Sequence, residues 1–158
     1  MKFALLTLAL LVSVTITAQA RLGENADQLV TRYGQPLKET DQKSEGTKVA
    51  SADVVFQKGG FQINVTVVDG ISVSESFWKL NGDPLTLEEA RTLLSANAQG
   101  RVWAAPVLVR GDKVWLRDDS ATAALMRSGT EMRIKSKELI SAQAQAKHLE
   151  RKPTLEGF

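Results

Sequence analysis

Thiols are absent from the chain, and imidazoles nearly so. It has no cysteine and one histidine, His148. Disulfides, a cysteine nucleophile and a lipid-bearing cysteine all require a thiol, so none is expected. An ordinary Ser-His-Asp triad or a multi-histidine metal site needs histidines held in the fold, whereas we expect His148 to be a solvated residue near the end of the last predicted helix. The sequence therefore predicts no catalytic residue, no metal site and no cofactor.

The chain also lacks a strong excess of either charge. Lys and Arg number 20 against 18 Asp and Glu, which gives a formal net charge of +2. The basic residues are scattered and form no polybasic run. This balance indicates neither a nucleic-acid partner nor attraction to a membrane surface.

Long apolar runs are equally scarce, and the one present runs from Phe3 to Ile16. It has about 14 residues, fewer than the roughly 20 that span a membrane. Lys2 precedes it and Ala18-Gln19-Ala20 follows it, an arrangement typical of a bacterial signal peptide and its cleavage site. We therefore expect residues 1–20 to be removed after Ala20, without stable membrane insertion, and the mature protein to be periplasmic or secreted.

Residues Ala52–Trp78 carry the clearest pattern, an apolar/polar alternation with the period of a strand. Two turn sequences interrupt it, Lys58-Gly59-Gly60 and Asp69-Gly70, so we expect a meander of three strands. In the middle strand the apolar residues are Phe61, Ile63, Val65 and Val67, and the polar ones are Gln62, Asn64 and Thr66. The pattern predicts a sheet with one buried and one open face.

The register of the second hairpin is predicted by keeping its apolar residues on one face. We expect a three-residue loop, Val68-Asp69-Gly70, with Gly70 in the left-handed conformation beside a bulge. The expected pairs are Val67 with Ile71, Val65 with Val73, and Phe61 with Phe77. Glu75 then lies opposite Ile63 on the apolar face. Either it reaches water or a loop cation at the edge of the core, or it is a buried functional acid with a shifted pKa.

Three helices are predicted from apolar spacing and capping sequences. The first carries Leu22, Ala26, Leu29, Val30 and Tyr33 on one face and ends at Gly34, before Pro36. The second begins at a capping box of Thr86 and Glu89 and buries Ala90, Leu93 and Leu94. The third is capped by Ser136 and carries Leu139, Ala142, Ala146 and Leu149. Residues 37–48 have no periodicity and are expected to form a mobile loop.

Two further hairpins are expected between the second and third helices. The first turns at Gly111-Asp112 and places Leu108 opposite Trp115. The second joins residues 121–126 to 130–135 through Arg127-Ser128-Gly129 and pairs Ala124 with Met132. Arg110-Gly111-Asp112 also matches the integrin-binding tripeptide, but Gly-Asp is ordinary turn chemistry, and we interpret it as a turn.

These elements predict an α+β protein in the order α-βββ-α-ββββ-α. Hairpin connections without a βαβ unit favour an antiparallel sheet with helices packed on one face. Residues 21–151 are long enough for a single globular domain, followed by a flexible tail at 152–158. Each of the two blocks 22–79 and 85–135 consists of a helix and a meander.

A family resemblance rests on a short helix ending in Arg32-Tyr33-Gly34-Gln35-Pro36 and a meander that closes on Asp69-Gly70. These features resemble small exported bacterial proteins of uncharacterised function. In outline they are also similar to the helix-plus-meander modules of β-lactamase-inhibitor-like proteins and BamE-type outer-membrane assembly proteins, although the lipid-attachment cysteine of the BamE pattern is missing. The resemblance covers about 50 residues and depends on structural positions. It implies a fold class and a binding role, and it carries over no functional residue.

The open face of the meander is the candidate binding surface. The predicted register sets Gln62, Asn64 and Thr66 beside Ser72, Ser74 and Ser76, with Trp78 at one end. We interpret Trp78, Asn64, Thr66, Ser74, Ser76 and the anomalous Glu75 as candidate binding residues. Tryptophan is common at interface hot spots, so Trp78, or Trp103 or Trp115, is expected to anchor a partner if it is exposed. A solvated face and core tryptophans are the alternative.

Three functions follow from these patterns. The preferred one is an exported, non-catalytic interaction protein that binds a protein or small ligand on the open sheet face. A small periplasmic hydrolase built on carboxylates such as Glu75, Asp118 and Asp119 is the second, although Asp118-Asp119-Ser120 is better explained as a turn. An envelope-assembly or structural role through the C-terminal helix is the third. Each requires a different exposed feature: Trp78, two converging carboxyls, or a helix that projects from the sheet.

Overall fold

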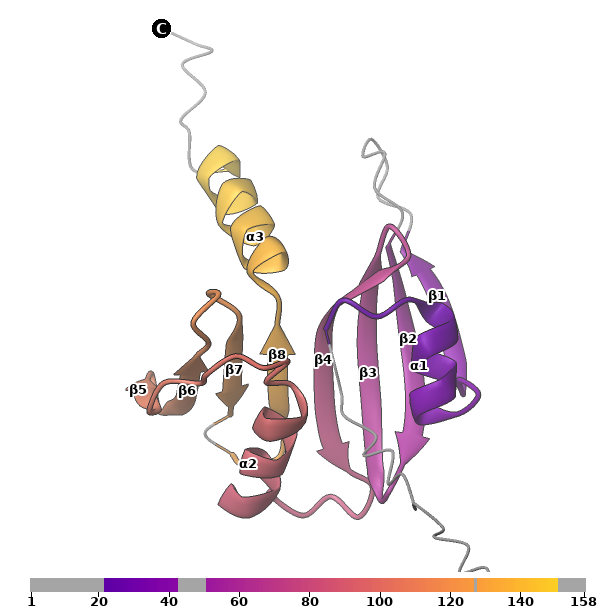
Figure 1. The fold of residues 1–158 in the computed structure, drawn as a ribbon, viewed down its shortest axis with the longest axis horizontal. Coiled ribbons are helices and arrows are strands. Elements are labelled where there is room, and N and C mark those ends of the chain that lie inside the picture. The colour runs from indigo at the N-terminus through magenta and orange to yellow at the C-terminus, as the bar shows by residue number, and fades with distance from the viewer. Residues whose placement is uncertain (1–21, 43–50, 127, 151–158) are drawn as a thin grey trace, which may run out of the picture.

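One antiparallel sheet of eight strands runs through the part of the chain that the structure describes (Figure 1). The structure is a computed structural model, and it describes residues 22–42, 51–126 and 128–150. The strand order is β1-β2-β3-β4-β8-β7-β6-β5. With three helices around the sheet, the predicted α+β class and element order are confirmed, and one further strand is added.

The first half of the molecule is a helix followed by a four-stranded meander. Its elements are α1 (Ala26–Tyr33), β1 (Lys38–Gln42), β2 (Ser51–Lys58), β3 (Phe61–Val68) and β4 (Ile71–Lys79). The added strand is β1, so the expectation of a loop over 37–48 is wrong for residues 38–42. Leu37 lies outside any strand, and residues 43–48 lie outside the described residues. An edge strand with exposed side chains needs no apolar alternation, which explains why the pattern of β1 gave no signal.

The second half repeats the same order with shorter strands. Its elements are α2 (Leu87–Ala96), β5 (Val107–Val109), β6 (Asp112–Leu116), β7 (Thr122–Leu125) and β8 (Met132–Lys135). The two halves join where their last strands pair, from Ser74 opposite Lys135 to Phe77 opposite Met132. We call this pairing of β4 with β8 the seam.

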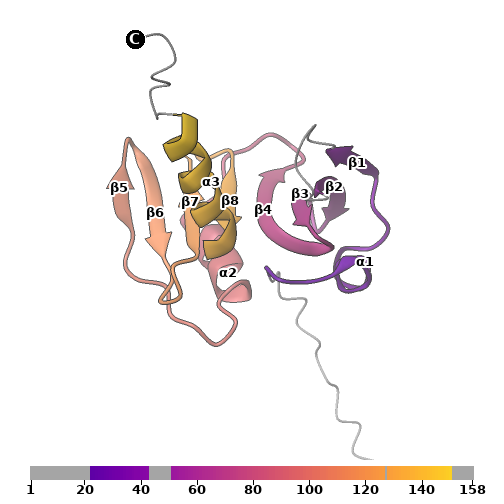
Figure 2. The same cartoon turned by 90° about the horizontal axis from the view of Figure 1, so that it is seen from above.

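Helices α1 and α2 lie on the same side of the sheet, and the core lies beneath them (Figure 2). The largest buried side chains come from both halves. They include Leu29, Tyr33, Phe56, Ile63, Val65, Phe77, Leu94, Trp115, Met132 and Ile134. One continuous core therefore spans the seam.

Both covering helices begin at a capping box. The box of Thr86 and Glu89 is confirmed, with backbone-to-side-chain distances of 2.7 and 3.1 Å. α1 begins later than expected, because Asn25 and Gln28 form its box at 3.0 Å each. Leu22 is buried but lies before the helix, in a segment that runs along β4: the Gly23 N–H donates to the Ser72 carbonyl at 2.8 Å. The spacing between Leu22 and Ala26 matches one helical turn, but Leu22 is not part of the helix.

The predicted register of the β3–β4 hairpin is wrong. Asp69 and Gly70 form a two-residue turn with φ of 49° and 80°, and Val68 pairs with Ile71. The register then shifts between Thr66 and Val67, where β4 has a bulge of one extra residue. Beyond the bulge, the apolar side chains of β3 and β4 lie on the same face again. Glu75 lies opposite Val65 and not Ile63, but on the apolar face as expected.

The two hairpins of the second half also differ from the predicted registers, the first by two residues in its pairing and the second by one. Arg110 and Gly111, both with positive φ, form the first turn, so Leu108 faces Lys113 rather than Trp115. This shift leaves Trp115 opposite Ala123 in the core. In the second hairpin the loop is one residue longer than expected, and Ala124 pairs with Arg133 while Leu125 pairs with Met132. Both buried side chains of that last pair thereby face the core.

The last helix, α3 (Lys137–Glu150), rises from the end of β8 (Figure 1). The Leu139 N–H donates to the Ser136 hydroxyl at 3.3 Å, which agrees with the expected cap. Leu139 and Ile140 are half-buried, whereas residues 141–145 are exposed. The helix therefore projects from the sheet beyond its first turn. Ala146, His148 and Leu149 are positions whose side chains lie outside the described residues. None of the described helices is both apolar enough and long enough to cross a bilayer.

Candidate functional site

Most of the predicted binding residues share the face of the sheet opposite α1 and α2. Thr66 pairs with Ser74, Asn64 with Ser76, and Gln62 with Trp78. Ser72 does not belong to this face, which corrects the prediction. It lies before the bulge, opposite Val67, and its hydroxyl accepts a hydrogen bond from the Glu24 N–H at 3.0 Å.

The centre of this open face is less accessible than expected. Ser74 and Ser76 are 7% and 8% exposed, because β8 places Lys135 and Arg133 beside them. The Arg133 guanidinium lies 3.4 Å from the Ser76 hydroxyl and also binds Glu131. A row of short hydroxyls on one strand is therefore shielded by long side chains from the next.

The tryptophans differ in their environments. Trp115 is 5% exposed and belongs to the core. Trp103 is half-buried, and its indole N–H donates to the Leu94 carbonyl at 2.8 Å, where α2 ends. Trp78 is half-buried on the open face, so it offers a partner only part of its ring.

The far end of the open face is apolar and was not predicted. The strand register sets five aliphatic side chains on this face of β5, β6 and β7: Val107, Val109, Val114, Leu116 and Ala124. We call this set the apolar end. Val107, Val109 and Leu116 are 60%, 48% and 52% exposed, and neither α1 nor α2 covers them. Alternation of Val114 and Leu116 with Lys113 and Trp115 was a usable signal in the sequence, and the predicted register already placed both residues on the face of Val107 and Val109.

Glu75 lies at the centre of the molecule, fully buried on the core side of β4. Tyr33, the last residue of α1, donates its hydroxyl to Oε1 at 3.1 Å, and Asn97, which caps α2, lies with Nδ2 3.5 Å from Oε2. Burial raises the pKa of Glu75 to about 7, and burial beside Glu75 also raises the pKa of Tyr33. Of the two alternatives for Glu75, the position at the edge of the core is therefore wrong, and the carboxyl is buried with a raised pKa. It links the ends of both helices to the seam.

The acidic pair at the β6–β7 turn has a structural role. Asp119 accepts two hydrogen bonds of 2.8 Å from the Arg117 guanidinium, which lowers its pKa to about 2. The same guanidinium donates to the Asn97 carbonyl at 2.5 Å and lies 5.4 Å from the centre of the Trp103 ring. Both carboxylate oxygens of Asp119 thus bind a buried arginine. Across the ranges 22–42, 51–126 and 128–150, no three carboxylates or histidines are grouped so as to hold a metal ion.

Comparisons with known proteins find little. No family model matches the chain, and no curated protein matches it either. Among solved structures, a cysteine-rich secretory protein from Staphylococcus aureus is 13% identical, with a TM-score of 0.41. The alignment covers 76% of this chain and 46% of that one, so the chain spans about half the length of that structure.

Proposed function

We propose that this is an exported, non-catalytic interaction protein that binds a partner protein on the open face of its sheet, with the apolar end as the main contact. The observation that carries the proposal is the exposure of Val107, Val109 and Leu116 together on one uncovered face. Exposed apolar side chains that adjoin one another are typical of protein–protein contact sites, whereas isolated ones are common on any surface.

The position of the apolar end at the sheet edge supports this function. β5 pairs with β6 on one side and is the last strand of the sheet on the other. A partner segment in extended conformation can therefore add to this edge, with main-chain hydrogen bonds for affinity and side-chain contacts for specificity. Leu108, 73% exposed on the other face of β5, extends the apolar contact around the edge.

The C-terminal helix supports a second candidate, an assembly role in which α3 pairs with another helix. Its residues 141–145 are exposed and it projects from the sheet. The carboxylate hydrolase has weaker support, because Glu75 is enclosed in the core and Asp119 is bound to Arg117. The apolar end is favoured over α3 because three bulky aliphatic side chains are exposed there side by side.

Site-specific photo-crosslinking in the native envelope fraction tests the proposal. A photoreactive residue is placed at Leu116 or Val107, with Gln57 on the far end of the same face as the matched control position and Ala144 on α3. We expect one protein adduct from positions 116 and 107 and none from 57. The adduct should disappear when Val109→Ser is added. Adducts from position 144 alone would overturn the proposal in favour of the helix.

A further inference from the structure

A cavity of about 260 Å³ lies between α1 and the first strands of the sheet, on the side away from the open face. Its walls come from α1, β1, β2 and β3 and from the turn before β4. The lining residues are Ala26, Leu29, Val30, Pro36, Glu39, Asp41, Ser51, Ala52, Val54, Phe56, Val67 and Gly70. The proposed function does not use this site, which faces the opposite direction.

Small residues on facing walls create the space. Ala26 on α1, Ala52 on β2 and Gly70 in the turn line the cavity and contribute little side-chain volume. The floor is formed by Leu29 and Phe56, each 1% exposed. The interior is therefore an apolar surface with a preformed shape, which is the usual character of small-molecule sites.

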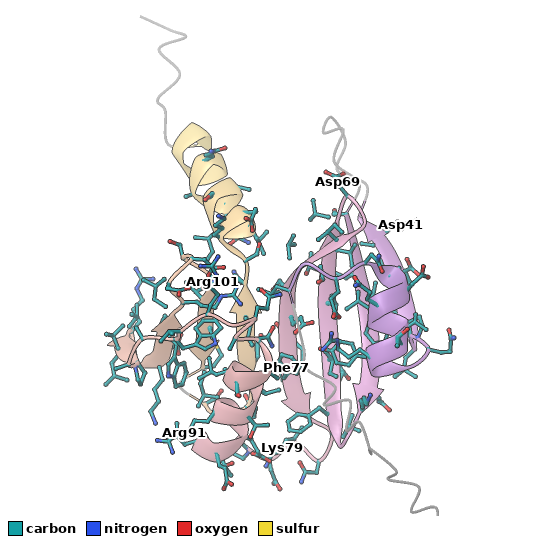
Figure 3. All side chains as sticks on the ribbon, in the orientation of Figure 1. Asp41, Asp69, Phe77, Lys79, Arg91 and Arg101 are labelled. Carbon is teal, nitrogen blue, oxygen red and sulfur yellow. The ribbon has the colours of Figure 1, made fainter. Side chains whose placement is uncertain are left out.

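The rim carries two negative charges on one strand. Glu39 and Asp41 alternate with Lys38 and Thr40 along β1, so both carboxylates point to the side of the cavity. Asp41 lies at the same end of the sheet as Asp69 (Figure 3). Among the lining residues in the described chain there is no lysine or arginine. The rim thus favours a cation over an anion, and the floor favours an apolar group.

We propose that this cavity binds a small organic cation with an apolar body, of the primary alkylamine class. At about 30 Å³ for each non-hydrogen atom, the cavity holds a ligand of about nine such atoms. The alkyl chain lies against Leu29 and Phe56, and the ammonium group remains at the rim beside Glu39 and Asp41. Both carboxylates are exposed, so their contribution is modest and falls with salt, and the apolar contact provides the remainder.

Titration of the purified protein with three probes of equal length tests the proposal: octylammonium, octanol and octanoate. Binding is followed by calorimetry and by ¹H–¹⁵N spectra at low salt. We expect saturable binding of octylammonium, about three- to tenfold weaker binding of octanol, weaker still for octanoate, and amide shifts confined to α1, β1 and β2. Absence of saturable octylammonium binding, or equal binding of all three probes, would overturn it.

Two variants locate the site. Glu39→Gln combined with Asp41→Asn should reduce octylammonium affinity about three- to tenfold and leave octanol affinity unchanged. Glu88→Gln combined with Glu138→Gln removes the same charge from exposed positions elsewhere and should change neither. Ala26→Phe should fill the cavity and abolish binding of both probes, in a protein whose circular dichroism shows that it is folded. Binding that survives Ala26→Phe would overturn the assignment.

Discussion

The two halves of the molecule follow the same plan and differ in strand length. Each begins with a capped helix on the same side of the sheet and continues with four antiparallel strands. β2, β3 and β4 have 8, 8 and 9 residues, whereas β5 to β8 have 3 to 5. The first half, with the longer strands, has a cavity between α1 and its sheet, whereas the second half, with the shorter strands, exposes aliphatic residues at its edge.

The halves also differ in how they reach the seam. α1 contributes Tyr33, and α2 contributes its cap residue Asn97; both contact the same carboxyl of Glu75. The second half adds Arg117, whose guanidinium donates to the Asn97 carbonyl at the end of α2. The two halves therefore share the buried carboxyl of Glu75, and its hydrogen bonds at the seam come from both of them. The following substitutions test how far the halves are equivalent.

Phe77→Ala should have the largest effect, because Phe77 is 2% exposed and lies at the seam between α2 and the strands of the first half (Figure 3). We expect the free energy of unfolding to fall by about 3–5 kcal/mol, measured by urea denaturation. Trp78 reports on the first half and Trp115 on the second, so single-tryptophan versions should show coincident transitions. Leu116→Ala is the exposed control and should change stability by less than about 0.5 kcal/mol. Separate transitions for the two halves would contradict a shared core.

The ionisation of Glu75 should make stability depend on pH across the seam. The folded protein holds the proton up to pH about 7, whereas the unfolded chain releases it near the ordinary value of 4.5. The folded state therefore binds more protons in this window, and stability falls as pH rises from 4.5 to 7, by about 3 kcal/mol, then stays level.

Glu75→Gln is the matched variant, because it keeps the shape and removes the ionisation. The difference in unfolding free energy between wild type and variant, measured at pH 4.5 and pH 8, isolates this carboxyl from the other titrating groups. We expect the variant to gain about 3 kcal/mol relative to wild type at the higher pH. A constant difference would show that folding does not raise the pKa of Glu75.

Each half contains an ion pair between an arginine and a carboxylate. Removal of either acid should lower the free energy of unfolding by a similar amount. Arg32 binds Glu24 in the first half, and Arg117 binds Asp119 in the second. We expect Glu24→Gln and Asp119→Asn each to lower stability by about 2 kcal/mol, since hydrogen bonds to charged groups are lost. The contribution of Asp119 is present above pH about 4 and is lost as pH falls through about 2, because its pKa is lowered on folding. Acid denaturation of Asp119→Asn should therefore lack this step, while Glu24→Gln retains it.

Substitutions at the two helix caps should have the smallest effects on stability, and the effects should be nearly equal in the two halves. Asn25→Ala and Thr86→Ala each remove the side-chain acceptor of a capping box, and each should cost about 1 kcal/mol. Asn25→Gly and Thr86→Gly, measured beside them by thermal denaturation, should cost only a few tenths, because glycine is tolerated at this position. A large cost in one half alone would show that the two helices are not equivalent in stability.

Sequence patterns revealed elements better than registers. The capping box at Thr86 and the apolar face that includes Glu75 depend on local chemistry, and both could be predicted. The three predicted hairpin registers were wrong, because Asp69 and Arg110 adopt positive φ without being glycine, because a bulge follows the β3–β4 turn, and because the β7–β8 loop is one residue longer than expected. The position of each turn, and with it the register, depends on the packing of residues far from the turn, such as Trp115. The apolar end was missed for a different reason: its residues share a face in either register, but their exposure depends on which parts of the sheet the helices cover.

Glu75 and the bulge beside it have a consequence for the order of assembly. β8 is the last strand of the described residues, so β4 is a bare sheet edge until the second half is complete. Bare edges attract strands from other molecules, and an inward-pointing charge or a bulge discourages such pairing. β4 has both devices, the carboxyl of Glu75 and the irregularity after Ser72. β8 then completes the sheet and α2 brings Asn97, whose amide donates to the Glu75 carboxyl. Until they arrive, both devices on β4 disfavour its pairing with strands of other molecules.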